Sequence, residues 1–136
     1  FGDAVYSPII GAGEADFIVS FEKLEGARYV SCLKPDGRII VNTQEIDPMP
    51  VITGMAEYPH DILDTLSEQG VAIDRLDALT LAEQAGSSKA VNIVLMGHLA
   101  RYFDFSKEEW LAAIEKSVAP RFLEMNRKAF AFGYEA

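Results

Sequence analysis

Cysteine, paired histidines and long apolar runs are scarce in this sequence of 136 residues. The one cysteine, Cys32, excludes an internal disulfide. It also excludes an iron–sulfur cluster held within the chain, because such clusters use about four cysteine thiolates. A single cysteine suggests a reducing compartment, so we expect a cytoplasmic protein. No apolar run approaches the ~20 residues of a membrane-spanning helix, and we expect no membrane association.

Positive charge is also scarce, with 12 Lys and Arg against 21 Asp and Glu and a net charge of −9. Phosphate backbones attract the opposite sign, so we expect no nucleic-acid partner. The deficit is concentrated in residues 39–74, which contain no Lys or Arg. This acidic stretch is either a solvated face or a docking surface for a basic partner. Its acids are Glu45, Asp47, Glu57, Asp61, Asp64, Glu68 and Asp74.

Several motifs of catalysis and cofactor binding are missing. The chain has no glycine-rich phosphate loop and no G-x-S-x-G nucleophile elbow. Its two histidines, His60 and His98, lie far apart and lack the spacing of metal ligands. His98 lies in an apolar segment and is predicted to be a hydrogen-bonded core histidine rather than a ligand. We therefore predict no metal site on this chain.

Residues 16–43 predict two strands joined by a helix, around which the rest of the chain is organised. Phe17–Phe21 is a short apolar run typical of a strand, and apolar residues over Leu24–Leu33 recur at roughly helical spacing. Lys34–Gly37 contains Pro and Gly and predicts a tight turn with positive φ at the glycine. Arg38–Val41 predicts a second strand. Strands joined in this way pair in parallel, and ligands bind beyond their carboxyl ends.

The remaining segments alternate between strand and helix and then become helical. We therefore predict a single three-layer α/β domain over residues 1–136, Rossmann-like, with an open, mainly parallel sheet and a helical C-terminal part. The expected strands are an edge strand Val5–Ile10, a short strand Val51–Met55, and Val71–Ile73. The expected helices are Pro59–Gln69, Leu76–Ala85, a buried helix through residues 91–103, one from the Ser106 capping box to about Val118, and one from Pro120.

Polar residues follow the two central strands and are candidates for contact with a ligand or a partner. Glu22 directly follows the first strand; it either makes such a contact or serves as a helix N-terminal acid that suits the helix dipole. Asn42, Thr43 and Gln44 end the next strand, where they either bind a ligand or partner or perform capping and turn roles.

Two further polar groups lie at the start of the apolar helix. Asn92 is its one amide, and a buried amide must find hydrogen-bond partners. It is therefore either a structural link to a loop or a contact residue. The run Ser87–Lys89 at the helix start either caps the helix or holds an anion.

An ordered set of stretches resembles a known family. They are residues 1–10, 13–16, 21–29, 33–44, 92–97 and 124–133. The fourth stretch contains an L-K-P-D-G turn, and the fifth is an N-x-x-x-M-G segment. Together they resemble the gamma subunit or domain of 2-oxoacid:acceptor oxidoreductases, in particular the beta subunit of indolepyruvate:ferredoxin oxidoreductase. The family normally begins with a strand and a G-x-G-G-Q-G turn. Neither is present here, so we expect an N-terminally incomplete chain that lacks the first βα unit.

The resemblance implies a subunit of a hetero-oligomer that oxidatively decarboxylates 2-oxoacids, aryl pyruvates in the indolepyruvate branch. Such a complex forms acyl-CoA and reduces ferredoxin. Thiamine diphosphate, Mg²⁺ and the iron–sulfur clusters are expected in a large alpha subunit, with no cofactor on this chain. The implied role is to complete the assembled site without supplying a catalytic residue. The acidic stretch and the aromatic C-terminal helix are the expected contacts.

Two other interpretations remain open. Asp16–Val41 also resembles the strand, helix, L-K-P-x-G turn and strand of class I methyltransferases, although the chain lacks a G-x-G-x-G loop. The third interpretation is a stand-alone Rossmann-like binding domain without catalysis.

Overall fold

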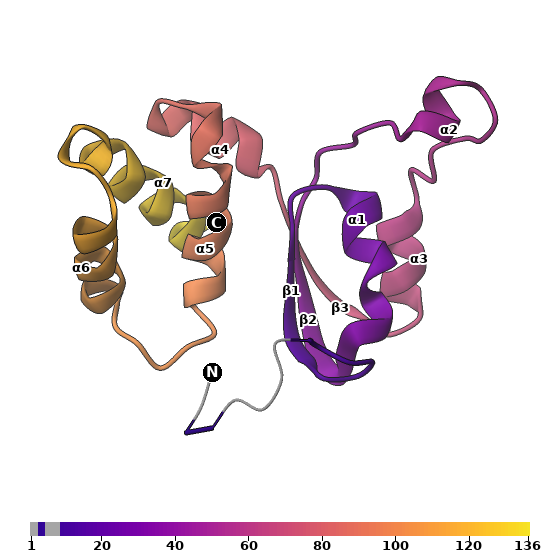
Figure 1. Ribbon diagram of the computed structural model, residues 1–136, viewed down its shortest axis with the longest axis horizontal. Coiled ribbons are helices and arrows are strands. Elements are labelled where there is room, and N and C mark those ends of the chain that lie inside the picture. Colours follow the sequence, from indigo (N-terminus) through magenta and orange to yellow (C-terminus); the bar gives the residue numbers. More distant parts are fainter. Residues whose placement is uncertain (1–2, 5–8) are drawn as a thin grey trace.

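The computed structural model describes residues 3–4 and 9–136, and its centre is a parallel sheet. Strands β1 (Ala15–Ser20), β2 (Leu33–Asn42) and β3 (Ala72–Leu76) pair in the order β1-β2-β3. Figure 1 shows helices on both faces of this sheet, so the predicted three-layer, open, parallel α/β fold is confirmed.

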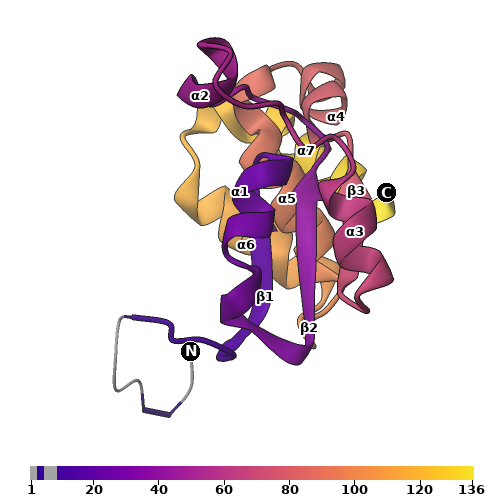
Figure 2. The same ribbon diagram turned by 90° about the vertical axis from the view of Figure 1, so that its right-hand side faces the viewer.

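The two helical layers differ in size. Helices α1 (Lys23–Arg28) and α3 (Ile62–Glu68) cover one face of the sheet (Figures 1 and 2). The opposite layer holds most of the C-terminal half of the chain, and none of the helices in the described part is long and apolar enough to cross a membrane. The elements of that layer are α4 (Ala78–Ala85), η2 (Ser88–Ala90), α5 (Val91–Ala100), α6 (Lys107–Ser117), η3 (Pro120–Phe122) and α7 (Leu123–Glu135).

Strand β2 supplies the core on both sides of the sheet. Ile39 and Val41 pack toward α1 and α3, whereas Ile40 packs toward α4, α5 and α7. All three side chains are fully buried. Alternation with period two explains how one apolar run serves both layers. Burying each such side chain stabilises the fold by roughly 1.5–3 kcal/mol.

The predicted tight turn at Lys34–Gly37 lies instead inside β2, where the pairing with β1 is interrupted. Ala15 pairs with Leu33 and Phe17 pairs with Arg38, so the extra residues of β2 form a bulge. The predicted positive φ at Gly37 is wrong, since Gly37 is not among the described glycines with positive φ. Glycine is needed there for space: an added Cβ would lie 2.7 Å from a Leu33 methyl carbon and 3.0 Å from the Ala15 carbonyl oxygen.

Two other elements differ from the sequence-based expectation. The helix predicted over Leu24–Leu33 ends at Arg28 and is followed by the 3₁₀ turn η1 (Val30–Cys32), whose residue types have modest helix propensity. The strand predicted over Val51–Met55 is wrong. The one-turn helix α2 (Met49–Ile52) lies there, with proline at its N-cap and in its first turn, where proline favours a helix start.

The other expected elements are confirmed, with ends shifted by up to a few residues. These include α3, β3, α4 ending at Gly86, the Ser106–Glu109 capping box of α6 and the final helix. Residues 5–8 of the predicted edge strand Val5–Ile10 lie outside the described residues, and Ile9 and Ile10 form no strand.

Helices α5 and α7 pack closely at two glycines. A Cβ added to Gly97 would lie 2.2 Å from the Phe130 carbonyl oxygen, and one added to Gly133 would lie 1.9 Å from the Val94 carbonyl oxygen. Phe130 and Val94 are fully buried. The prediction of a buried apolar helix over this segment is therefore confirmed.

A carboxylate links the sheet to this helical layer. Asp74 on β3 accepts hydrogen bonds from Arg38 of β2 at 2.6 Å, from the Tyr102 hydroxyl, and from Nε2 of His98 on α5 at 2.8 Å. His98 is 7% exposed, so the prediction of a hydrogen-bonded core histidine is confirmed.

Candidate functional site

The carboxyl edge of the sheet brings Glu22 and the β2–α2 connection together. Glu22 is the N-cap of α1, and its carboxylate accepts a hydrogen bond from the Glu25 backbone N–H at 2.9 Å. Its other oxygen accepts bonds from the Ile46 N–H at 3.4 Å and from the Tyr58 hydroxyl. Glu22 is 5% exposed, so its carboxylate makes contacts within the chain and is shielded from solvent.

The hydrogen bonds around Glu22 also set its ionisation. Burial raises its pKa, but the bonds from the Tyr58 hydroxyl and from backbone N–H groups outweigh burial and lower the pKa overall. Burial, followed by the bond to the Glu22 carboxylate, raises the pKa of Tyr58. Glu22 is therefore a carboxylate anion at neutral pH and has no proton to donate to a substrate.

Asn42 is equally occupied by contacts within the fold. Its amide nitrogen donates to the Phe21 carbonyl at 3.0 Å and to Oε1 of Gln44 at 3.3 Å, while its oxygen accepts from the Ala78 N–H at 3.1 Å. The side chain is 1% exposed. Asn42 thus ties the ends of β1 and β2 to the start of α4, and the half-buried Thr43 continues this link by donating its N–H to the Leu76 carbonyl at 2.8 Å.

A pocket of about 350 Å³ lies beside these groups, between the segment after β2 and the start of α5. It brings together Gln44 and Asn92, which the sequence singled out separately. Among the described residues, Lys89 at its rim forms no ion pair. The pocket is lined by Phe21, Gln44, Ile46, Leu79, Ser88, Lys89, Val91 and Asn92.

The structure separates the predicted site residues into two groups. Gln44 and Asn92 line the pocket. Glu22 and Asn42 lie behind it and fix its wall by hydrogen bonds: Glu22 accepts from the Ile46 N–H, and Asn42 donates to the Phe21 carbonyl. The expectation of a buried Asn92 is wrong: Asn92 is exposed, because its side chain lies on the side of α5 away from the core that Ala90 and Val94 enter. Contact roles for Glu22, Asn42, Thr43, Gln44 and Asn92 remain predictions.

Sequence reasoning missed the apolar wall of the pocket. Phe21 is 53% exposed and Ile46 is 56% exposed, although both belong to runs that read as strand or loop. One feature of the sequence could have indicated this wall: Phe21 is an aromatic residue at a strand end, directly before the predicted contact residue Glu22.

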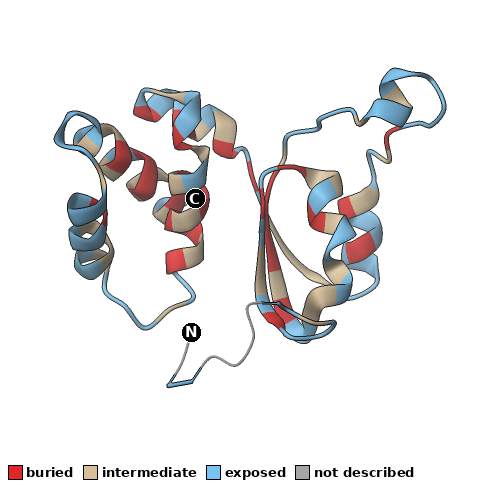
Figure 3. Cartoon of the chain, viewed as in Figure 1, coloured by how far each residue is buried: buried red, intermediate tan, exposed pale blue. Residues whose placement is uncertain are grey.

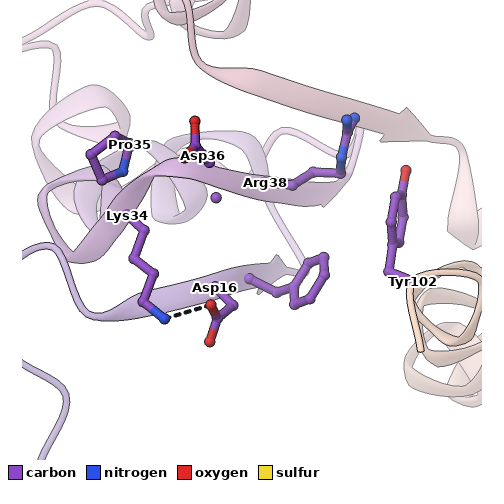
Figure 4. Close-up of a pocket in the computed structure, with 8 residues that line it drawn as sticks. Asp16, Lys34, Pro35, Asp36, Arg38 and Tyr102 are labelled. Atoms are coloured by element: carbon purple, nitrogen blue, oxygen red, sulfur yellow. Dashed lines mark hydrogen bonds and ion pairs between the residues drawn. The ribbon is translucent and has the colours of Figure 1, made fainter. Parts of the chain in front are cut away.

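A larger hollow of about 610 Å³ lies where β1 and β2 begin, and Figure 4 shows its lining. Its cations are neutralised within the chain: Lys34 pairs with Asp16 at 2.5 Å, and Arg38 pairs with Asp74 at 2.6 Å. The Arg38 guanidinium also lies 5.1 Å from the centre of the Tyr102 ring. The smaller pocket, with Lys89 at its rim, is therefore better suited to an external anion.

Metal-binding groups do not cluster in the part of the chain that the structure describes. No three His, Cys, Asp or Glu side chains come close enough there to hold a metal ion. The thiol of Cys32 is half-buried within η1 and is free of any disulfide.

Comparison with known proteins identifies the family. The family model of pyruvate ferredoxin/flavodoxin oxidoreductases matches residues 1–136. The chain belongs to this family. The resemblance inferred from the sequence is thereby confirmed, and neither the methyltransferase nor the stand-alone interpretation is favoured.

The curated relatives carry one name, indolepyruvate oxidoreductase subunit IorB. Those of Thermococcus kodakarensis and Pyrococcus horikoshii are 36% and 37% identical over 141 residues, covering 100% of this chain and 70% of each relative. The relative from Archaeoglobus fulgidus is 33% identical over 134 residues. The aligned region covers 96% of this chain and 67% of that relative.

A solved structure shares the fold. It is the gamma subunit of a keto/oxoacid ferredoxin oxidoreductase from Geobacter sulfurreducens, with a TM-score of 0.65 and 23% identity. The similarity covers 93% of this chain but 66% of that subunit, so the chain spans about two thirds of its structural relative.

Proposed function

We propose that this chain is a subunit of a 2-oxoacid:ferredoxin oxidoreductase that acts on indolepyruvate or related aryl pyruvates. The observation that carries the proposal is the family match over the whole chain. Identities of 33–37% to relatives named indolepyruvate oxidoreductase subunits support the choice of substrate class.

In this proposal the chemistry takes place on a large partner subunit in the cytoplasm. That subunit holds thiamine diphosphate, Mg²⁺ and iron–sulfur clusters, and the complex converts the 2-oxoacid to acyl-CoA while reducing ferredoxin. Two features of this chain support a non-catalytic role. The Glu22 carboxylate is ionised and internally bonded, and the Asn42 amide is saturated by contacts within the fold.

The pocket beside β2 is the proposed point of contact with the assembled site. Phe21 and Ile46 provide an apolar wall, while Gln44, Asn92 and Lys89 provide amide groups and a cation. A pocket with apolar walls and a few polar groups suits a ligand with an apolar body and an anionic group. Both an aryl 2-oxoacid and CoA have that character.

Reconstitution tests the proposed function. The chain and the large subunit are purified separately and mixed, and indolepyruvate-dependent, CoA-dependent reduction of ferredoxin is followed spectroscopically. We expect activity from the mixture that greatly exceeds the activity of either component. A chain that leaves the activity of the large subunit unchanged and does not copurify with it contradicts the proposal.

Variants of the pocket test its role within the complex. For Lys89→Ala and Asn92→Ala we expect a KM for the 2-oxoacid or CoA raised several-fold with kcat nearly unchanged, because uniform binding is lost without loss of a reacting group. Lys116→Ala, which removes an exposed lysine on α6, is the matched control and should change neither constant. Unchanged KM values in both pocket variants refute this contact role.

A further inference from the structure

The segment between β2 and α3, residues 46–57, projects from the body of the molecule and is here named the arm. Figure 1 shows its helix α2 standing away from the sheet and the other helices. Figure 3 shows that it is almost entirely exposed. Its apolar side chains are nevertheless large: Ile46, Met49, Ile52 and Met55 are 56%, 66%, 64% and 77% exposed. Such a concentration of exposed apolar surface marks an interaction site.

The arm has a defined backbone. The Pro48 carbonyl accepts from the Val51 and Ile52 N–H groups, and the Pro50 carbonyl accepts from the Met55 N–H at 2.8 Å. Gly54, at φ +73°, allows the chain to reverse after α2. Two prolines and this turn restrict the free chain, so less conformational entropy is lost when the arm binds.

Both ends of the arm are fastened to the sheet by one carboxylate. Glu22 accepts from the Ile46 N–H, where the arm begins, and from the Tyr58 hydroxyl, directly after it ends. A second link lies alongside, because Glu45 pairs with Lys23 at 2.7 Å and with His60 at 2.8 Å. These contacts present the apolar side chains in a fixed direction.

We propose that the arm docks into an apolar groove on the large subunit whose rim carries Lys and Arg side chains. This inference rests on the proposed function for the existence of that subunit. The basic rim follows from charge: the arm lies in the stretch 39–74, which contains no Lys or Arg, and Asp47 and Glu57 belong to the arm itself. A second copy of this chain, with a net charge of −9, would meet the arm with like charge.

Docking at the arm also places the partner over the pocket. Ile46 is both the first residue of the arm and part of the pocket wall. A partner that covers Ile46 therefore closes the pocket on the side away from α5, and Gln44, Lys89 and Asn92 then face an enclosed space.

The test replaces apolar side chains of the arm with charge. Full-length wild-type chain and the double variant Met49→Asp, Ile52→Asp are titrated onto the purified large subunit, and Kd is measured by calorimetry or interferometry. Both positions are mainly solvent-exposed, so circular dichroism should show an unchanged fold. We expect the double variant to bind at least 10-fold more weakly than the control described next.

The matched control is Phe122→Asp, which charges another exposed apolar residue in the helical layer, where Phe122 is 44% exposed. Binding by the arm variant within 10-fold of this control overturns the arm proposal while leaving the proposed function intact. A wild-type chain that binds no large subunit overturns both. A wild-type homodimer that the arm variant dissociates in sedimentation would show a second copy as the occupant and also overturns the proposal.

The basic rim has its own test. Glu57→Lys reverses one charge on the arm, and we expect weaker binding with a smaller dependence of Kd on salt. Stronger binding of this variant, or no change, would show that the rim of the groove is not basic.

Discussion

The α5–α7 helix pair and the arm are both apolar, but they use their apolar surface in opposite ways. In the helix pair, Gly97 and Gly133 let the two backbones approach, so Phe130 and Val94 become fully buried. In the arm, Pro48 and Gly54 shape a turn that projects away from the body, and its large side chains stay exposed. Apolar surface stabilises the chain itself in the first region and is available for association in the second.

Each region is also linked to the sheet by one carboxylate. Asp74 joins Arg38 on β2 to His98 and Tyr102 on the helical side, whereas Glu22 joins α1 to the two ends of the arm. The helical layer is held by an extensive apolar core as well as by Asp74. The arm has no such core, and its position depends on the hydrogen bonds of Glu22 and its neighbours. Changes to the helical layer should therefore alter global stability, and changes to the arm should alter local order.

The largest loss of stability is expected where the backbones of α5 and α7 are in contact. Gly133→Ala places a methyl group within 1.9 Å of the Val94 carbonyl oxygen, and a backbone atom cannot move aside cheaply. We expect a loss of about 3 kcal/mol or more in the free energy of unfolding, at the upper end for overpacking. Urea unfolding followed by circular dichroism measures the loss. A change below ~1 kcal/mol would show that the helix pair is not tightly fitted; Lys128→Ala on the same helix is the control.

Asp74→Asn should weaken the link between the sheet and the helical layer. Burial raises the pKa of Asp74, but bonds from Tyr102, His98 and Arg38 lower it below its ordinary value of 3.8. The stabilisation is therefore present above pH 3.8 and is lost as the pH falls through the lower folded-state pKa. We expect the variant to be about 2 kcal/mol less stable near pH 7, since hydrogen bonds to a charged group are lost.

The pH dependence of this difference checks the assignment. Unfolding free energies of wild type and Asp74→Asn should converge as the pH is lowered below 3.8. Asp64→Asn, which removes an exposed partner of Arg75, is the control and should cost no more than about 0.5 kcal/mol. A difference for Asp74→Asn that persists unchanged at low pH would assign the effect to packing.

Glu22→Gln should loosen the arm while leaving the helical layer unaffected. Both carboxylate oxygens accept from donors, so the amide group of glutamine must turn its own donor toward one of them. We expect a stability loss of roughly 1–2 kcal/mol. Hydrogen exchange should accelerate in residues 46–57 and stay unchanged in α5 and α7. Equal acceleration in both regions would remove the proposed distinction between them.

The smallest effect is expected for the exposed side chains of the arm. Met49→Ser combined with Ile52→Ser should change the unfolding free energy by no more than about 0.5 kcal/mol, because both side chains are already exposed. Leu95→Ala, a fully buried position of α5, should cost roughly 2–5 kcal/mol in the same assay. A marked destabilisation by the arm variant would mean that this chain itself uses the arm for stability.

Local signals accounted for much of the fold. The capping box at Ser106, the helix stop at Gly86 and the apolar helix around His98 were all predictable, because each depends on residues a few positions apart. The strand predicted over Val51–Met55 was wrong although local prolines favour a helix start there, but two other predictions were wrong because neighbours distant in sequence decide. Position 37 has room only for glycine because Ala15 and Leu33 lie against it, and Asn92 is exposed because its side of α5 does not face the packed core.

The candidate site shows the same limit. The sequence pointed to Glu22, Asn42 and Gln44 at strand ends, and parallel pairing does bring them to one edge of the sheet. Which of these residues are buried and which line the pocket depends on tertiary contacts. Tyr58 and Ile46 bind Glu22, and Ala78 binds Asn42, from distant parts of the chain.

The sequence by itself therefore determined the parallel βαβ unit, most of the helices and the family, because periodicity, proline, glycine and capping residues act over short distances. Only the tertiary structure decided which apolar surface is covered. The approach of α5 to α7 at Gly97 and Gly133 covers one surface, and the turn after Pro48 leaves the other exposed. Burial depends on what the rest of the chain can reach, and that is a property of the whole fold.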